Sequence, residues 1–305
     1  MPSGQQIEIV HREQRATVVE VGGALRTYCI GEREVLDGYS SHERCTGARG
    51  QTLIPWPNRL EGGAYTFDGQ EHQLPVSEPE KHNAIHGLVR WSNWSVAERD
   101  NHRVVMTHRL HPQPGYPFAL DLSIAYSLSA AGLRVTTTAT NIGPKPCPYG
   151  AGAHPYLTVG TELLDDAMLT IPAHTWLPAD GRGIPHGEQP VDGTPYDFRA
   201  ARTIAGTELD TGYTDLLRDD EGLARVELSV RGGDAAVALW LDESHPYLMV
   251  FTGDSLPEPE HRRRGLGVEA MTCAPNAFRS GAGLRVLEPG SSFTGGWGIE
   301  PGPGA

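Results

Sequence analysis

Two histidines and one glutamate lie in stretches that are otherwise rich in small and apolar residues. Together such side chains can form an acid–base set, because histidine titrates near neutral pH and desolvation raises the pKa of a carboxylate. Each one alone has a simpler interpretation, since a single histidine in a glycine-rich turn more often packs or hydrogen-bonds. The three stretches are residues 83–91 around His86, residues 148–157 around His154, and residues 267–278 around Glu269.

The motifs of several other chemistries are missing from the sequence. It contains no GxGxxG after a strand, no GxxxxGK[ST], no GxSxG and no HExxH. We therefore expect no cofactor and no metal. An acid and a base facing each other can still open a cyclic sugar, because the base takes the anomeric hydroxyl proton while the acid protonates the ring oxygen. Ring closure on the other face of the carbonyl then gives the other anomer.

Composition limits the class of protein and its partners. The 305 residues carry a formal net charge of −13, which argues against nucleic acid as a partner because phosphate binding needs a basic surface. We see no signal peptide and no apolar run of the roughly 18 residues that a membrane helix needs. The four cysteines are far apart in the sequence, which favours reduced thiols in the cytoplasm. The oligomeric state stays open.

Alternation of apolar and polar residues predicts an all-β protein with antiparallel sheets. The strands are long enough for the large sheets of a sandwich. We find no convincing amphipathic helix, and residues 209–217 are at most a short turn of one. Because no linker or change of composition interrupts the pattern, we expect one domain over residues 1–305. The clearest expected strands are residues 103–107, 120–128, 133–140, 226–230, 236–241, 247–252 and 292–299, with a hairpin at 63–74.

Residues 49–63 break this alternation. Pro55 and Pro57 exclude a central strand, so we expect a loop that holds Trp56, Asn58 and Arg59 together. Taken alone, Arg59 is most simply a solvated loop charge. The charged segment 257–265 is most simply an exposed loop.

Four of these stretches, in this order, resemble the aldose 1-epimerases, also called galactose mutarotases. The resemblance covers about residues 20–299 and implies the galactose mutarotase-like fold, a large antiparallel β-sandwich with a sugar in an open cleft. The activity implied is interconversion of the α and β anomers of an aldose, with a small sugar as the partner. The residues that carry it are Pro57-Asn58-Arg59, Asn83-x-x-His86-Gly87, Ala153–Leu157, and Gly267–Thr272 with Pro275–Phe278.

The resemblance also implies a role for each of these residues. Glu269 would be the base at the anomeric hydroxyl, His154 the acid at the ring oxygen, and His86 a hydrogen-bond partner near that oxygen. Asn58 and Arg59 would bind sugar hydroxyls. For the aspartate that the family carries between the second histidine and the glutamate, Asp215 is the best match, with Asp210 and Asp219 nearby.

One departure from the best-known galactose mutarotases concerns the substrate. His86-Gly87 is followed by Leu88, Val89 and Arg90, and a His-Gly-x-x-Arg run resembles the branch that acts on hexose 6-phosphates or sulfonated sugars. Arg90 either pairs with such an anion or covers Trp91 or Trp94 with its stem.

Two rival functions remain. One is a carbohydrate-binding protein on the same fold, which would not need an acid facing a base. The other is a lyase or hydrolase on a similar fold, and hydrolases commonly use two carboxylates. Only Glu269 is well placed as a carboxylate, so we favour the epimerase.

Overall fold

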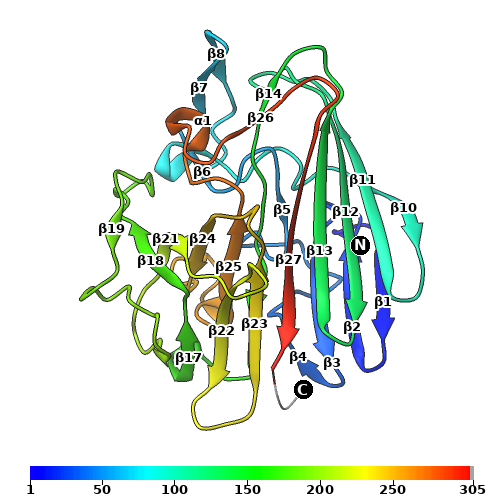
Figure 1. The fold of residues 1–305 in the computed structure, drawn as a ribbon. Coiled ribbons are helices and arrows are strands. Elements are labelled where there is room, and N and C mark those ends of the chain that lie inside the picture. Colours follow the sequence, from blue (N-terminus) through cyan, green and yellow to red (C-terminus); the bar gives the residue numbers. More distant parts are fainter. Residues whose placement is uncertain (303–305) are drawn as a thin grey trace.

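The computed structural model describes residues 1–302, which form a large antiparallel β-sandwich (Figure 1). This confirms the predicted fold class. The largest sheet has nine strands, and each pairs antiparallel with its neighbours. In spatial order these are β10 (Ser95–Arg99), β11 (Arg103–Leu110), β12 (Leu120–Ser129), β13 (Gly132–Asn141), β27 (Ser292–Pro301), β23 (Ala236–Leu241), β22 (Ala224–Val230), β17 (Ala167–Thr170) and β20 (Arg202–Thr203).

A second sheet of eight strands carries the residues of interest, and β25 lies near its middle. Its strands are β19 (Gln189–Pro190), β18 (Ala173–Leu177), β21 (Asp210–Leu216), β24 (Tyr247–Phe251), β25 (Leu266–Met271), β15 (Gly152–Ala153) and β5 (Thr52–Leu53), with β16 (Tyr156–Leu157) also pairing with β25.

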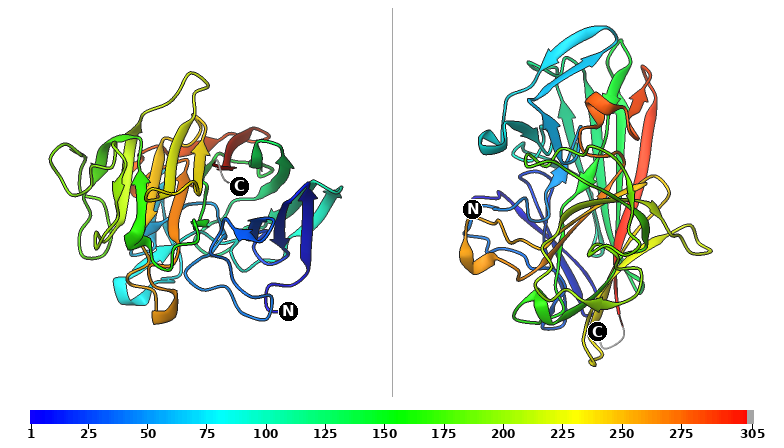
Figure 2. Two further views of the ribbon diagram at one scale, coloured as in Figure 1. Left: turned by 90° about the horizontal axis from the view of Figure 1, so that it is seen from below. Right: turned by 90° about the vertical axis from the view of Figure 1, so that its left-hand side faces the viewer.

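Smaller elements complete the fold. The N-terminal sheet packs on β11 and β12, as the blue and teal strands of Figure 2 show. It contains β1 (Gln6–His11), β2 (Gln14–Val19), β3 (Leu25–Ile30) and β4 (Arg33–Glu34). Three two-stranded pairs are β6 (Arg59–Glu61) with β9 (Asn83–Ile85), β7 (Ala64–Phe67) with β8 (Gln70–Gln73), and β14 (Cys147–Tyr149) with β26 (Arg285–Leu287). The helices are α1 (Ala277–Ser280) and the 3-10 turns Pro79–Lys81, Leu164–Asp166 and Pro259–His261.

The core forms where alternate side chains of the strands face inward. Along β12 every second residue from Leu120 to Leu128 is buried, and polar or small residues occupy the positions between them. On β24 and β25 the core-facing residues are Leu248, Val250, Val268 and Ala270. Because strand side chains alternate, the intervening residues project from the other face of the eight-stranded sheet.

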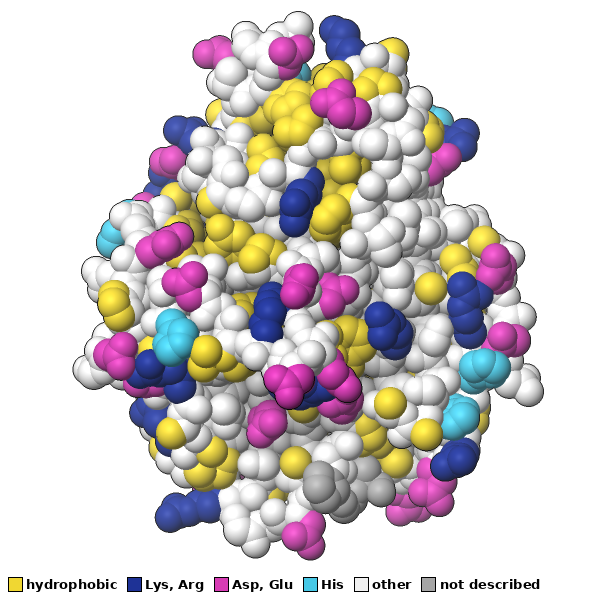
Figure 3. Space-filling model, in the orientation of Figure 1, with side chains coloured by type: hydrophobic (Ala, Val, Ile, Leu, Met, Phe, Trp, Pro, Cys, Tyr) yellow, Lys and Arg dark blue, Asp and Glu magenta, His cyan; other side chains and the backbone are white. Residues whose placement is uncertain are grey.

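The surface visible in Figure 3 mixes both signs of charge. Lys and Arg side chains lie among Asp and Glu side chains over this face, and apolar side chains gather near β7 and β8. Charges of both signs are therefore interspersed over this face and not separated into an acidic and a basic part.

The structure confirms most of the expected strands and corrects one segment. The predicted hairpin at 63–74 is β7–β8, and the seven clearest strands become β11, β12, β13, β22, β23, β24 and β27. The suggestion of a helical turn at 209–217 is wrong, because this segment forms β21 between β18 and β24. Four consecutive buried residues, 211–214, hide its alternation, so only the pairing with its neighbours reveals a strand.

Candidate active site

Glu269 projects from the side of β25 that faces away from the core. Its neighbours Val268 and Ala270 point into the core, so alternation directs the carboxylate to the opposite face. Loops cover this face so closely that Glu269 is only 2% exposed. The carboxylate nevertheless lines a cleft of about 430 Å³, within the roughly 300–1,000 Å³ typical of small-molecule sites.

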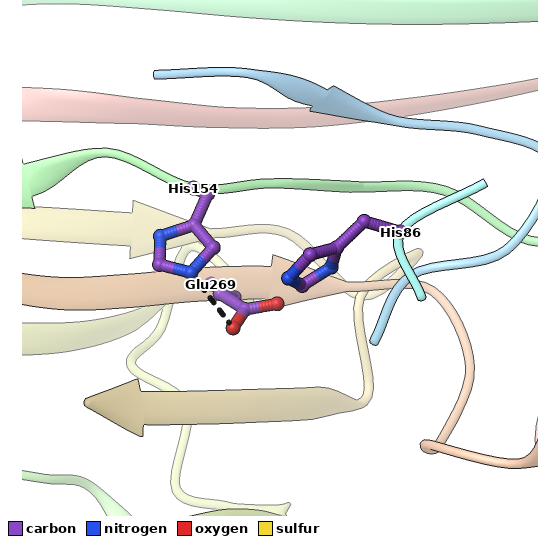
Figure 4. Close-up of side chains that lie close together, drawn as sticks. All are labelled: His86, His154 and Glu269. Atoms are coloured by element: carbon purple, nitrogen blue, oxygen red, sulfur yellow. Dashed lines mark ion pairs between the residues drawn. The ribbon is translucent and has the colours of Figure 1, made fainter. Parts of the chain in front are cut away.

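His154 reaches this carboxylate because the chain around it pairs twice with β25. Gly152 on β15 pairs with Met271, and Tyr156 on β16 pairs with Gly267, so the intervening turn passes beside Glu269. The Nε2 atom of His154 lies 3.3 Å from Oε1 of Glu269 (Figure 4). A Cβ added to Gly267 would lie 3.1 Å from Cε1 of His154, so a larger residue there would crowd the imidazole.

His86 follows β9 and is held by two reciprocal bonds to Asn58. The His86 N–H donates to the Asn58 carbonyl at 2.9 Å, and the Asn58 N–H donates to His86 Nδ1 at 3.2 Å. Nδ1 is therefore an acceptor, and the proton of the neutral ring is on Nε2. The two imidazoles meet edge to face, with 5.4 Å between ring centroids (Figure 4). The cluster thus has an N–H donor on His86 besides the His154–Glu269 pair.

The three side chains fit proton transfer better than a metal ion. Their ligand atoms lie within 4.8 Å of one another, which is close enough for a shared cation. A metal needs a free lone pair on each histidine, however, and the lone pair of His86 Nδ1 already accepts the Asn58 N–H. Metal binding through Nε2 would require the other tautomer and would leave that N–H without its partner.

Burial and nearby charges move the pKa values of Glu269 and His154 in opposite directions. Burial, reinforced by the Asp210 charge, raises the pKa of Glu269 to about 8. Burial also lowers the pKa of His154 to about 3, and the cations Arg90 and Arg49 act in the same sense. At neutral pH the pair therefore holds one proton on two groups that are 3.3 Å apart. Such a pair titrates as a unit.

The pKa of His86 is likewise lowered well below its usual value. Burial is the main cause, and Arg90 is the next. His86 is therefore neutral at physiological pH, which agrees with its role as an acceptor for the Asn58 N–H.

Arg59 lines the cleft but is already paired with two carboxylates. Its Nε lies 3.0 and 3.1 Å from the two oxygens of Glu78, and its Nη1 lies 3.1 Å from Asp210. Burial alone would lower the pKa of Arg59, yet Asp210 and Glu78 outweigh it and raise this pKa. The sequence-based interpretation as a solvated loop charge is wrong, since Arg59 is buried and lies on β6.

Arg90 also lines the cleft, but no carboxylate lies within ion-pair distance of it among residues 1–302. Within the described residues, its side chain makes one hydrogen bond, a long one of 3.5 Å to Oε1 of Gln51. The guanidinium carbon lies 6.0 Å from the centre of the Trp91 ring, and burial lowers the pKa of Arg90. The cleft therefore contains a cation that is not neutralised by an acid.

The structure does not bring Asp215 to the cleft. This residue is exposed on β21, and it accepts a hydrogen bond from the Thr175 hydroxyl. Asp210, five residues earlier on the same strand, lines the cleft and bonds Arg59. Its strand partner is Phe251, which in turn pairs with Gly267, two residues from Glu269. We therefore correct the aspartate assignment to Asp210.

Two residues of the cleft's surroundings gave no signal in the sequence. Glu78 lies in a charged loop, where nothing distinguishes it from its neighbour Glu80. Arg49 lies behind the cleft, where its guanidinium lies over the Tyr156 ring and its Nε is 3.3 Å from Asp37. The remaining expected residues, Asn58, Arg59, His86, Arg90, His154 and Glu269, all line the same cleft.

A model of the aldose 1-epimerase family matches residues 5–299. The chain belongs to this family. It is 35% identical over 289 residues to the uncharacterized protein YihR of Escherichia coli K12, covering 94% of this chain and 90% of that protein. It is 27% identical over 323 residues to the aldose 1-epimerase of the same strain, covering 96% of this chain and 86% of that protein. Membership supports an isomerase and confirms the resemblance noted in the sequence.

Solved structures of epimerase homologues share the fold. The GalM/aldose epimerase homologue from C. elegans superimposes with a TM-score of 0.86 at 17% identity, covering 97% of this chain and 99% of that one. A putative aldose 1-epimerase from Escherichia coli K12 superimposes with a TM-score of 0.83 at 18% identity, covering 97% of this chain and 98% of that one. Like them, the chain has the galactose mutarotase-like fold. Within residues 1–302, we find no helix with the length and apolar character needed to span a membrane.

Proposed function

We propose that this protein is a mutarotase that interconverts the α and β anomers of an aldose without a cofactor. The observation that carries the proposal is the buried pair of His154 and Glu269, 3.3 Å apart, which shares one proton inside a sugar-sized cleft. A binding protein needs hydrogen-bonding groups for the sugar hydroxyls but no acid and base that share a proton, and burying such a pair costs stability.

Ring opening needs the shared proton on His154. Transfer from Glu269 across their contact gives a carboxylate and an imidazolium. Glu269 then takes the proton of the anomeric hydroxyl while His154 protonates the ring oxygen, so the ring C–O bond breaks and a carbonyl forms. The pair ends with its proton on Glu269, as it began. After rotation about the C1–C2 bond, closure on the other face of the carbonyl reverses these transfers and gives the other anomer.

The remaining residues of the cleft would orient the sugar. The N–H at Nε2 of His86 would donate a hydrogen bond to the sugar near its ring oxygen. The Asn58 N–H, by donating to Nδ1, fixes the tautomer that permits this. Arg59 would bind sugar hydroxyls from a position fixed by Glu78 and Asp210. Because these supports are rigid ion pairs, the hydroxyl contacts need little reorganisation on binding.

The rate should depend on pH through the shared proton. Loss of that proton leaves no acid, and a second proton leaves no base. With pKa values of about 8 for Glu269 and about 3 for His154, we expect kcat/KM to be flat through neutral pH and to fall above about pH 8. Stopped-flow polarimetry corrected for spontaneous mutarotation would measure this profile. A rate that rises through pH 8 would contradict it, since it would mean that the free enzyme works with the proton lost.

We further propose that the preferred aldose carries an anion, such as a phosphate or sulfonate at C6. Arg90 supports this proposal, because a guanidinium without an acid partner at a cleft wall can pair with such a group. It also lies close enough to His86 and His154 to lower the pKa of both. The other interpretation is that Arg90 covers Trp91. It is the weaker one, because the guanidinium carbon lies 6.0 Å from the centre of the Trp91 ring, which is the outer limit of a cation–π contact.

Replacing Arg90 tests this substrate class. We expect Arg90→Ala to raise KM for glucose 6-phosphate by about 10-fold or more, since a charge-assisted bond is lost. Glucose and galactose should change by no more than about 3-fold, and Arg90→Lys should retain part of the preference. The ratio of kcat/KM values between sugars cancels any shift in the pKa values of the histidines. Equal losses on all three sugars would remove the anion site.

The experiment that tests the function itself is NMR exchange between anomeric protons, with glucose, galactose and glucose 6-phosphate measured side by side. Faster exchange on any sugar in the presence of protein would support the mutarotase. Line broadening without faster exchange on all three would favour a carbohydrate-binding protein instead.

We also propose that the chain is a single domain and that it functions in the cytoplasm. All four cysteines are free, and three of them are buried, as is usual for proteins of a reducing compartment.

A further inference from the structure

Arg49 is a buried cation directly behind His154, outside the cleft. It is 2% exposed, and its Nε lies 3.3 Å from Asp37, its only carboxylate partner among the described residues. Its other bonds, to Thr46, are long at 3.4 and 3.5 Å, and its Nη2 is buried without any partner. An incompletely bonded buried guanidinium is costly. Fold stability alone therefore gives a poor account of this residue.

The Tyr156 ring connects Arg49 to the imidazole of His154. The guanidinium carbon of Arg49 lies 4.7 Å from the centre of this ring, and the His154 ring stacks on it at 4.9 Å with an angle of 11°. The Tyr156 hydroxyl donates to the Gly47 carbonyl at 2.7 Å, which anchors the ring to the segment that carries Arg49. The plane of the imidazole is thus set by a ring that Arg49 itself contacts.

The backbone next to Arg49 holds His154 as well. The Gly50 N–H donates to the His154 carbonyl at 2.8 Å, and the His154 N–H donates to the Gln51 carbonyl at 3.2 Å. Gly50 has φ near +66°, and a Cβ there would collide with the Leu25 carbonyl, so only glycine fits this position. The side-chain amide of Gln51 donates to the Arg90 carbonyl at 3.2 Å. Residues 49–51 therefore contact both the acid and the proposed anion-binding residue.

We propose that Arg49 is a positioning residue for His154, which acts through the Tyr156 ring to hold the imidazole edge against Glu269. This inference rests on the proposed acid role of His154. The groups that face His154 are Glu269 from β25, Asp210 from β21, His86 and Arg90 from the segment after β9, and Tyr156 from β16. Among these, the Tyr156 ring is the one stacked parallel to the imidazole.

Two variants separate positioning from folding. Arg49→Lys keeps the cation opposite Asp37 but loses the planar face over Tyr156. The double variant Arg49→Met with Asp37→Asn removes both buried charges, so that neither is left unpaired. In both we expect kcat to fall by about 10-fold with KM within about 2-fold, because a displaced acid affects the transition state more than binding. Arg225→Met, which removes an ion-paired arginine from β22, serves as the control for a general loss of stability.

NMR of the imidazole nitrogens gives a second measurement that needs no activity. In the free protein, both Arg49 variants should broaden or shift the His154 signals and leave those of the exposed His102 unchanged. If both variants keep kcat within 2-fold and keep the wild-type His154 signals while their melting temperatures fall, Arg49 is structural only. If the wild type proves inactive on every sugar, the proposed function fails. The NMR signals then decide the positioning role alone, with altered signals supporting it and unaltered signals overturning it.

Discussion

Glu269→Gln should abolish mutarotation while leaving sugar binding nearly intact. The amide has almost the same shape as the carboxylate, so the cleft and the contact with His154 should persist. It cannot accept the anomeric proton, however, and loss of a general base typically costs about 100- to 10,000-fold. We expect a fall in kcat of about 1,000-fold or more on every sugar that the wild type accepts. Anomeric proton exchange measures the rate, and titration of the sugar signals measures binding.

A control separates this effect from a change of charge alone. Glu227→Gln on β22 makes the same substitution at an exposed position of the other sheet, and its rate should stay at the wild-type value. Near-normal turnover in Glu269→Gln would remove Glu269 as the base. Loss of binding together with turnover would instead make this carboxylate a hydroxyl ligand.

The strands could be predicted from the sequence because burial on one face imposes a period of two. Residues 120–128 alternate plainly, and β12 covers this range with one more residue at its end. The same signal fails at β21, where both faces of residues 211–214 are covered. A strand that is buried on both faces shows no alternation of apolar and polar residues, so its periodicity does not distinguish it from part of a helix.

The residues of the candidate site were predicted where a motif surrounds them. Glycines and small residues surround each of His86, His154 and Glu269. The structure explains them by the close approach of neighbouring segments, since a larger residue at Gly267, for example, would crowd the imidazole of His154. The aspartate was not predicted correctly, because Asp210 and Asp215 lie on one strand and only its register with β24 decides which of them faces the cleft. Sequence spacing carries no information on that register.

The contacts of the buried arginines could not be predicted from the sequence, for a related reason. Arg59 binds Glu78 and Asp210, and the second of these is 151 residues away in the sequence. Neither pair has a local motif, since each joins segments that meet only in the folded chain. Arg49 was missed in the same way, because its contact with Tyr156 joins segments more than a hundred residues apart.

His154→Ala should lower turnover by at least about 100-fold, the usual cost of losing a general acid. The substitution also removes a ring that stacks on Tyr156, so a loss through packing has to be separated from a loss of chemistry. Imidazole added to the solution distinguishes the two. The variant leaves space beside Glu269 in which free imidazole can carry the proton, so we expect saturable recovery of part of the rate. His102→Ala, at an exposed position, should neither lose activity nor respond to imidazole.

The comparison with His86→Ala decides which histidine is the acid. His86 Nδ1 accepts the Asn58 N–H, and its pKa is lowered well below the usual value by burial and by Arg90, so this ring donates a hydrogen bond but resists a second proton. We therefore expect a smaller loss for His86→Ala than for His154→Ala, and no rescue by imidazole. An unchanged rate in His154→Ala would transfer the acid role to His86. That result would also require Asn58 to give up its bond to Nδ1, because an imidazolium that acts as the acid carries a proton on Nδ1 as well and cannot accept the Asn58 N–H there.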